Sequence, residues 1–238
     1  MRKEKKMKKV KLFLTVWLVG LIGGIVFWVL RLTKRIEVFG YKKDKFISKD
    51  KSLILISNHP SLWEPAILPF LLFPRFIFSR KQIPFSLMDK GYFKKKWFTV
   101  FRPVCIPIER GNRREELRTA NKVEEMLKNK RTLIVYPECG RTFLGKEFRN
   151  SATHSGRIRK FPEGIRRLVG KGSVILTIWV EGSDEVIPNR GKGLFCFLPK
   201  IWKKTKIFIG QPFEFNEVVP VNSIVEFLEN KLLETRLF

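Results

Sequence analysis

SLILISNHPSLWE, residues 52–64, is the stretch that decides the fold of this sequence. Its first six residues are four aliphatic side chains between two serines, and they stop abruptly at an asparagine, a histidine and a proline. A short apolar run that ends at a turn is typical of a strand buried on both faces. We therefore predict a buried strand over Ser52–Ser57, with polar side chains at its carboxyl end.

Similar apolar runs recur along the chain, separated by more polar segments that are long enough for crossover helices. The other expected strands are Phe76–Ser79, Val104–Ile108, Thr132–Tyr136 and Val174–Val180, with Ile207–Ile209 as a sixth candidate. Helices are expected over Arg113–Lys130, around Ile165–Val169 and over Asn222–Leu233. The polar segment Gly145–Arg159 is expected to be a mobile loop. This alternation predicts an α/β fold whose mixed, mostly parallel sheet is flanked by helices.

The composition indicates one domain with a polyanionic partner. The 238 residues leave room for one core, and 48 Lys+Arg against 22 Asp+Glu give a formal charge of +26. The 22 Phe and 6 Trp favour an anionic membrane surface over nucleic acid, for which no recognition motif is present. The three cysteines lack CxxC spacing, so we expect no disulfide framework and no metal site. They are Cys105, Cys139 and Cys196.

A charge-free stretch, Leu12–Leu30, is just long enough for a helix to cross about 30 Å of hydrocarbon. A cleaved signal peptide is less favoured, because the run is long and no small-residue cleavage site follows it. Mid-segment glycines leave two alternatives, a re-entrant or interfacial hairpin and a single membrane-spanning helix with glycines at a packing face. These are Gly20, Gly23 and Gly24. We assign residues 1–35 to a basic N-terminus with a membrane anchor and residues 36–238 to one domain. That domain begins with a basic linker, which ends at about Lys51.

Polar side chains follow four of the expected strands. In open α/β sheets ligands bind outside the carboxyl ends of strands, so these side chains should converge on one sheet edge. The groups are Asn58-His59-Pro60-Ser61-Leu62-Trp63-Glu64, Glu109-Arg110-Gly111, Pro137-Glu138-Cys139-Gly140-Arg141-Thr142 and Glu181-Gly182.

In order and spacing these four groups resemble the motifs of the glycerophospholipid acyltransferase family, in particular the bacterial membrane-bound 1-acylglycerol-3-phosphate acyltransferases. The resemblance covers about half of the chain, and the apolar anchor is also similar. It implies an O-acyltransferase of phospholipid biosynthesis that moves a fatty acyl group from acyl-CoA or acyl carrier protein to a lysophospholipid. Lysophosphatidic acid is the leading acceptor, and phosphatidic acid would be the product.

The same resemblance implies a place on the cytoplasmic face of the cell membrane, with anionic lipids as partners. It implies no cofactor beyond the thioester co-substrate, and no nucleic acid. The alternative is a catalytically altered or non-catalytic relative that binds lipid at the membrane surface.

The family's motifs imply roles for individual residues. His59 would remove the proton from the attacking hydroxyl, and Glu64 would hold the other ring nitrogen. Side chains five residues apart diverge on an ideal helix, so a turn at Pro60 must bring these two together. Arg110 and Arg141 would bind the acceptor phosphate, because the guanidinium fork matches phosphate oxygens.

Two further residues receive supporting roles from the resemblance. Glu138 would order its loop in the substrate-binding region, and Lys160 would add a phosphate contact. Phe161-Pro162-Glu163-Gly164 spells the same motif as Tyr136-Pro137-Glu138-Cys139 more closely. We expect it to be a decoy, because no buried strand precedes it. His154 is expected to be exposed and without a role.

The sequence departs from the family pattern in three places. Glu64 stands where relatives have Asp, Cys139-Gly140 replaces Gly-Thr, and Thr177 replaces a Pro. The extra methylene of Glu64 requires an adjustment on the order of 1 Å in the backbone or imidazole. Cys139 is expected to fill the glycine's place as a small residue rather than to act as a nucleophile.

Overall fold

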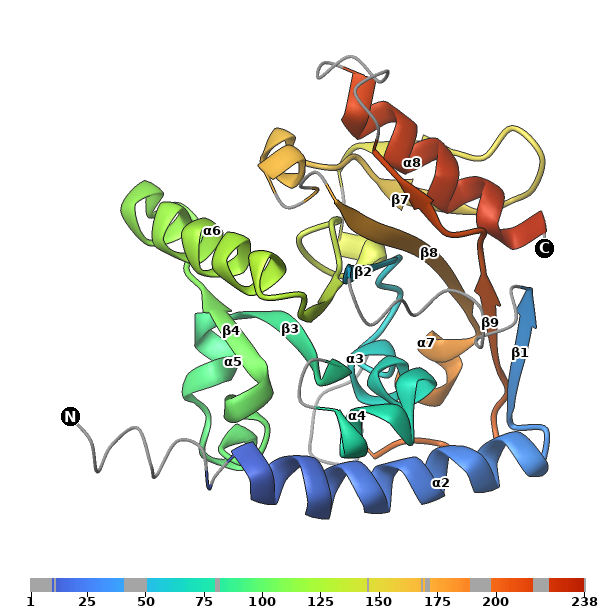
Figure 1. The fold of residues 1–238 in the computed structure, drawn as a ribbon. Coiled ribbons are helices and arrows are strands. Elements are labelled where there is room, and N and C mark those ends of the chain that lie inside the picture. Colours follow the sequence, from blue (N-terminus) through green and yellow to red (C-terminus); the bar gives the residue numbers. More distant parts are fainter. Residues whose placement is uncertain are drawn as a thin grey trace.

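A mostly parallel sheet forms the centre of the molecule in the computed structural model (Figure 1). The structure describes residues 10, 12–40, 51–79, 82–144, 146–167, 169, 172–188, 198–215 and 223–237. The eight-stranded sheet has the order β1-β9-β8-β2-β5-β3-β4, with β10 paired to β8. Its strands are β1 (Ile36–Gly40), β2 (Ser52–Ser57), β3 (Pro84–Asp89), β4 (Cys105–Ile108), β5 (Thr132–Val135), β8 (Ser173–Glu181), β9 (Thr205–Ile209) and β10 (Phe213–Glu214).

The strand β2 is central and buried at all six positions, as its unbroken apolar sequence predicts. It pairs in parallel with β5 on one side and with β8 on the other. The carboxyl ends of these three strands therefore lie at the same edge of the sheet. The strands β9 and β1 run antiparallel to β8, which makes the sheet mixed.

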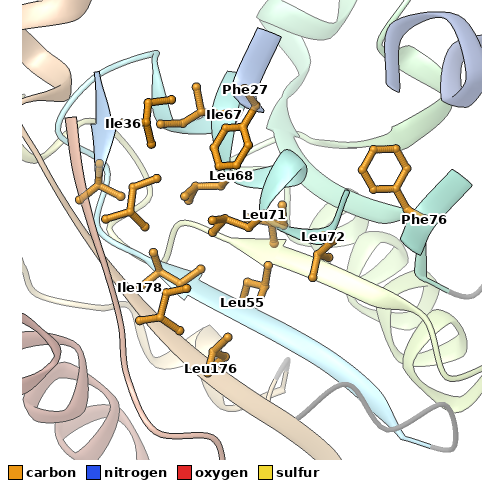
Figure 2. Packing of buried hydrophobic residues seen from close by; sticks show 14 of the residues in the cluster. Phe27, Ile36, Leu55, Ile67, Leu68, Leu71, Leu72, Phe76, Leu176 and Ile178 are labelled. Carbon is orange, nitrogen blue, oxygen red and sulfur yellow. The ribbon is translucent and has the colours of Figure 1, made fainter. Parts of the chain in front are cut away.

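Helices cover both faces of the sheet (Figure 1). Successive β2 side chains alternate between the faces: Leu53 and Leu55 pack toward α3, η3 and α2, and Ile54 and Ile56 pack toward α6 and α8. Figure 2 shows the first of these two cores. The principal helices are α2 (Gly20–Leu32), α3 (Glu64–Ile67), α4 (Arg75–Phe78), α5 (Lys90–Lys94), α6 (Arg113–Lys128), α7 (Ser183–Val186) and α8 (Ile224–Glu234). Shorter or irregular turns are η1 (Thr15–Val19), η3 (Leu68–Leu72), η5 (Lys96–Phe98), η6 (Arg102–Val104), η7 (Thr142–Leu144), η8 (Glu163–Arg167) and η11 (Thr235–Leu237).

The apolar N-terminal segment is one continuous helix over Leu12–Leu32, long and apolar enough to cross a membrane by length and composition. Of the two alternatives, the structure therefore has a helix and not a hairpin. Its glycines lie against the aromatic rings of the following segment: a Cβ on Gly20, Gly23 or Gly24 would come within 2.7, 2.1 or 2.3 Å of a ring atom. The rings are those of Phe76, Phe70 and Phe73, respectively.

Five expected strands are confirmed within one or two residues, but Phe76–Ser79 is wrong. That segment lies mostly in the short helix α4, and the next strand of the sheet is β3. Its Phe and Ile favour strands locally, yet Phe76 is buried where it contacts Gly20 of α2. Tertiary packing overrides local propensity there. The sequence did not predict β1, which lies within the expected linker and pairs with β9. Residues 41–50 of that linker lie outside the described residues.

The expected helices at Arg113–Lys130 and Asn222–Leu233 correspond to α6 and α8, although Asn222 lies outside the described residues. Around Ile165–Val169 the described residues, which leave out residue 168, form the 3-10 turn η8 in place of the expected helix.

The mobile loop expected over Gly145–Arg159 is a wrong prediction. The segment contains an antiparallel pair, β6 (Phe148–Asn150) and β7 (Arg157–Arg159). Arg149 of this pair binds Glu226 and Glu229 of α8 at 2.8 and 3.0 Å, a long-range contact that local composition does not reveal.

Candidate active site

The ends of β2, β5 and β8 meet at one edge of the sheet and hold the site. Asn58 fixes two of them together, because its side chain bonds the backbone of β8 in both directions. Its Nδ2 donates to the Val180 carbonyl at 2.9 Å, and its Oδ1 accepts from the Val180 N–H at 2.8 Å. The asparagine thus continues the strand ladder with its side chain and leaves the next residue, His59, at the rim.

His59 and Glu64 are brought together by a turn over residues 60–63. The Nδ1 atom of His59 lies 3.1 Å from Oε2 of Glu64, whose side chain is fully buried. A ring nitrogen beside a carboxylate carries the proton, which assigns the tautomer from the hydrogen-bond pattern. The turn at Pro60 therefore closes the separation that helical spacing alone would leave.

Ser61 explains how a glutamate fits at this position. Its backbone N–H and its hydroxyl both donate to the Glu64 carboxylate, at 3.0 and 3.1 Å, and its Oγ accepts from the Trp63 N–H at 2.9 Å. These bonds hold the Glu64 carboxylate in place at the first residue of α3. The longer carboxylate therefore contacts Ser61 and the imidazole together.

The imidazole of His59 is clamped between Glu64 and the ring of Tyr136, whose centroid lies 4.7 Å away. Within the described part of the chain, Nε2 of His59 has no hydrogen-bond partner, and the side chain is 14% exposed. An Nε2 lone pair at an accessible rim can accept a proton from a bound hydroxyl. The positive charge that then forms lies beside the buried carboxylate.

Glu138 organises the loop after β5. Its Oε1 accepts from the His59 backbone N–H and from the Thr142 hydroxyl, both at 2.8 Å, and its Oε2 accepts from the Arg159 backbone N–H at 3.0 Å. Burial raises the pKa of this carboxyl, and the hydrogen bonds with these donors oppose the rise. Because only 1% of the residue is exposed, its contacts are structural ones within the protein.

The arginines lie around the loop after β5. Arg110 is exposed and Arg141 is half-buried, with its guanidinium 4.9 Å from the centre of the Phe143 ring. Burial raises the pKa of the Cys139 thiol, and the nearby charges of Arg110 and Arg159 lower it in part. A thiol that burial keeps protonated is a poor nucleophile.

Lys160 lies in an exposed ion pair. Its ammonium lies 3.3 Å from Glu147, and its side chain is 62% exposed. The preceding residue, Arg159, approaches the site. Its Nη1 lies 2.6 Å from the place that a Cβ on Gly140 would take, so the guanidinium lies against the loop after β5. The assignment of Lys160 to the phosphate stays a prediction, and Arg159 is a second candidate beside it.

The two Pro-Glu segments occupy different environments. Glu138 is bonded to His59, whereas Glu163 is 69% exposed and pairs with Arg166. The reason given for the decoy was wrong in one respect, because the short strand β7 precedes it and Ile158 in that strand is buried. That strand belongs to the separate two-stranded sheet, so the second Pro-Glu does not follow a strand of the central sheet.

His154 is not exposed and idle. Its Nε2 lies 2.7 Å from the Leu233 carbonyl, and its Nδ1 accepts from the Gly156 N–H at 2.9 Å. The imidazole therefore ties the loop between β6 and β7 to the end of α8. Among the described residues no group of three or more His, Cys, Asp or Glu is placed to hold a metal ion, and Cys196 lies outside them.

Comparison with known proteins finds a family and similar solved structures. A family model described as Acyltransferase matches residues 38–182. The chain is also similar to the crystal structure of the 1-acyl-sn-glycerophosphate (LPA) acyltransferase, PlsC, from Thermotoga maritima. The TM-score is 0.58 at 22% identity, over 100% of this chain and 84% of that one. An identity this low establishes a shared fold alone. No curated protein matches the sequence.

Proposed function

The chain belongs to the acyltransferase family, and on that premise we propose that it transfers a fatty acyl group from an acyl thioester to the free hydroxyl of lysophosphatidic acid. The observation that carries the proposal is the pair formed by His59 and Glu64 at the carboxyl end of β2. It is an imidazole base whose orientation and charge are controlled by a buried carboxylate.

In the proposed reaction Nε2 of His59 takes the proton from the acceptor hydroxyl as its oxygen attacks the thioester carbonyl. Glu64 keeps Nδ1 protonated and balances the imidazolium charge. The tetrahedral intermediate then collapses, the carbon–sulfur bond breaks, and the imidazolium returns the proton to the departing thiolate. An ester and a free thiol result, without a covalent enzyme intermediate.

Three arginines support an anionic acceptor. Arg110, Arg141 and Arg159 lie around the loop whose Glu138 holds the His59 backbone. No described carboxylate pairs with the guanidinium of Arg110 or Arg159, so both have capacity for phosphate oxygens. Beside Lys160 we assign Arg159 to the phosphate, together with the two arginines expected from the sequence.

We place α2 in one leaflet, parallel to the membrane plane. Val16 and Leu30 are both buried against the domain, so about 20 Å of the helix is packed on protein. The opposite face exposes large apolar side chains, among them Leu18, Ile22, Ile25 and Val29. A perpendicular crossing would carry η3 and α4 into hydrocarbon with the helix. The leaflet is the cytoplasmic one, where anionic lipids attract a basic chain.

The donor is an acyl-CoA or an acyl carrier protein thioester. Both are anionic, as the +26 charge favours. No cofactor takes part in the proposed steps, because each proton moves through His59.

The test is acyl transfer by the purified full chain on anionic vesicles, with each donor and a panel of lysophospholipids, followed by mass spectrometry. We expect phosphatidic acid from lysophosphatidic acid, and we expect His59→Ala to abolish it while leaving vesicle binding intact. Activity of the wild type that equals the His59→Ala background with every pair would favour a non-catalytic lipid-binding relative.

A further inference from the structure

The turn between α7 and β9 exposes three large apolar side chains to solvent. Leu198, Ile201 and Trp202 are 59%, 51% and 60% exposed. Single exposed apolar residues are ordinary on soluble proteins, but three within five positions form a patch that needs a partner. Described residues of this turn span 198–204, directly before β9.

Hydrogen bonds hold the backbone of this turn in place. The Lys200 N–H donates to the Val186 carbonyl of α7 at 2.8 Å, and the Lys203 N–H donates to the Lys200 carbonyl at 2.9 Å. Gly182 allows the backbone to approach closely, because a Cβ there would lie 2.4 Å from the Lys204 carbonyl oxygen. The exposed side chains therefore stand on an ordered support.

The turn lies beside the C-terminal end of α2. Arg35, three residues after that helix, donates from Nη1 to the Trp202 carbonyl at 2.7 Å and accepts from the Thr205 N–H at 2.8 Å. In Figure 1 the start of β9 meets the chain at this end of α2, at the lower edge of the molecule. The turn is thus adjacent to the C-terminal end of the helix, where Leu32 is 76% exposed.

Basic residues surround the patch. Lys200, Lys203 and Lys204 are all exposed, and the two ion pairs formed in this group, with Glu185 at 3.2 Å and Glu37 at 3.8 Å, lie at the surface. Aromatic side chains bordered by lysines are typical of the headgroup boundary of an anionic bilayer, because rings occupy the interface and ammonium groups pair with phosphates. The surface chemistry therefore fits a lipid bilayer.

We propose that residues 198–204 form a second membrane-contact element, in which Ile201 and Trp202 enter the headgroup boundary and the three lysines bind anionic lipid. The inference rests on the membrane residence of α2 proposed above. The element would give the protein a second membrane contact beside α2. Two contacts would fix how the domain is rotated about the axis of α2. Rotation about that axis decides whether His59 faces the lipid or the cytosol.

The experiment compares full-length Ile201→Ser/Trp202→Ser with the wild type for binding to vesicles of phosphatidylglycerol and phosphatidylcholine. The matched control is Leu117→Ser/Leu237→Ser, two exposed apolar residues on α6 and η11, away from α2 (Figure 1). We expect a loss of roughly tenfold in vesicle affinity for the first variant and little change for the control. Lys200→Gln/Lys203→Gln/Lys204→Gln should lower the salt dependence of binding.

A second measurement reads insertion directly. Lipids brominated near the headgroup should quench tryptophan fluorescence of the wild type more than that of Trp202→Phe. Two results together would overturn the proposed membrane contact of residues 198–204. These are equal quenching of the wild type and Trp202→Phe, and equal vesicle affinity of the wild type and Ile201→Ser/Trp202→Ser. They would leave the proposed reaction and the membrane residence of α2 unaffected. Failure of the wild type to bind vesicles at all would overturn the membrane residence together with this inference.

Discussion

At the scale of single residues, the Glu64 carboxylate makes two kinds of contact. It accepts hydrogen bonds from Ser61, and it lies beside Nδ1 of His59. We predict that Glu64→Asp lowers kcat by about tenfold or more, since the shorter side chain reaches either the Ser61 donors or the imidazole but not both. Glu64→Gln should cost on the order of 10²–10⁴ in kcat, because the amide cannot balance the imidazolium. Steady-state kinetics measures both variants.

Ser61→Ala is the companion variant, because it removes one donor to Glu64 without changing the carboxylate. Ser61→Ala should lower kcat less than Glu64→Gln does. Full activity of Glu64→Gln would contradict the assigned pairing and leave His59 to act alone.

The hydroxyl of Thr142 gives a pH-dependent prediction. Burial raises the pKa of Glu138 above the ordinary 4.5, and the Thr142 hydrogen bond opposes that rise. Because the folded state then holds the proton more tightly than the unfolded state, the contribution of Glu138 to stability falls as pH rises from the ordinary pKa through the folded one. Thr142→Val should raise the pKa of Glu138 in the folded state further. The resulting loss of folding stability is largest at pH values where Glu138 is ionised.

We therefore expect Thr142→Val to cost about 1–3 kcal/mol at a pH well above the folded pKa of Glu138 and less as the pH falls toward the ordinary 4.5. Thermal unfolding in detergent over this pH range measures it, with Thr142→Ser as the control that keeps the hydroxyl. A cost that is the same at both ends of the range would mean that the hydroxyl does not interact with the ionised carboxylate.

Part of this residue-scale picture could be predicted from the sequence. The pairing of His59 with Glu64 followed from the resemblance to the acyltransferase motifs, and the choice of Glu138 over Glu163 followed from its place directly after an apolar strand. Asn58, Ser61 and Tyr136 were quoted without roles. Ser61 lies three residues from the carboxylate that it contacts, whereas the cross-strand bonds of Asn58 depend on β8, which lies more than a hundred residues away in the chain.

At the scale of elements, the pair β6 and β7 brings a cation to the site. We predict that Arg159→Gln raises the KM for lysophosphatidic acid by about tenfold, equivalent to about 1.4 kcal/mol, because a phosphate contact is lost. The glutamine keeps the backbone N–H that Glu138 accepts. Lys160→Gln on the adjacent position is the matched control and should change this KM little.

The donor KM separates the two substrates in that assay. An equal rise in the KM for the acyl thioester would move Arg159 to the donor site. A larger effect from Lys160→Gln would restore the residue that the sequence alone favoured.

The helix α2 gives the second prediction at this scale. A methyl group on Gly24 would lie 2.3 Å from the Phe73 ring, so Gly24→Ala should lower the free energy of unfolding by about 1–3 kcal/mol despite a better helix propensity. Gly164→Ala is the control, because nothing lies within 4 Å of its added methyl group. Thermal unfolding compares them. Equal melting temperatures would show that the ring moves freely away from the helix.

The sequence predicted that α2 exists but not how it lies. Its composition is apolar on every side, so nothing local distinguishes the face that packs on protein from the face left for lipid. The glycines marked a packing face only as an alternative, since the rings that fill it belong to a later segment. The strand β3 was missed for a related reason, because Phe and Ile in α4 gave a stronger local signal than β3 itself.

At the scale of the whole molecule, the anchor is part of the domain's core, because Val16, Phe27 and Leu30 belong to the same buried cluster as β2 and β8. We predict that deletion of residues 1–32 aggregates the protein instead of releasing a soluble domain, since it uncovers Phe70, Phe73 and Phe76. Size-exclusion chromatography after expression without detergent measures this. A monodisperse, active fragment would show that the domain folds without its helix.

The contact between Gly20 and Phe76 also has a consequence for biosynthesis. Roughly fifty residues separate α2 from the rings that cover it, which at ordinary rates of translation amounts to roughly 2–10 s. During that interval the newly made helix has no protein partner, and lipid is the apolar surface within its reach. On the membrane residence proposed above, we expect the helix to enter the bilayer first and the rest of the polypeptide to assemble on an element that the membrane already holds.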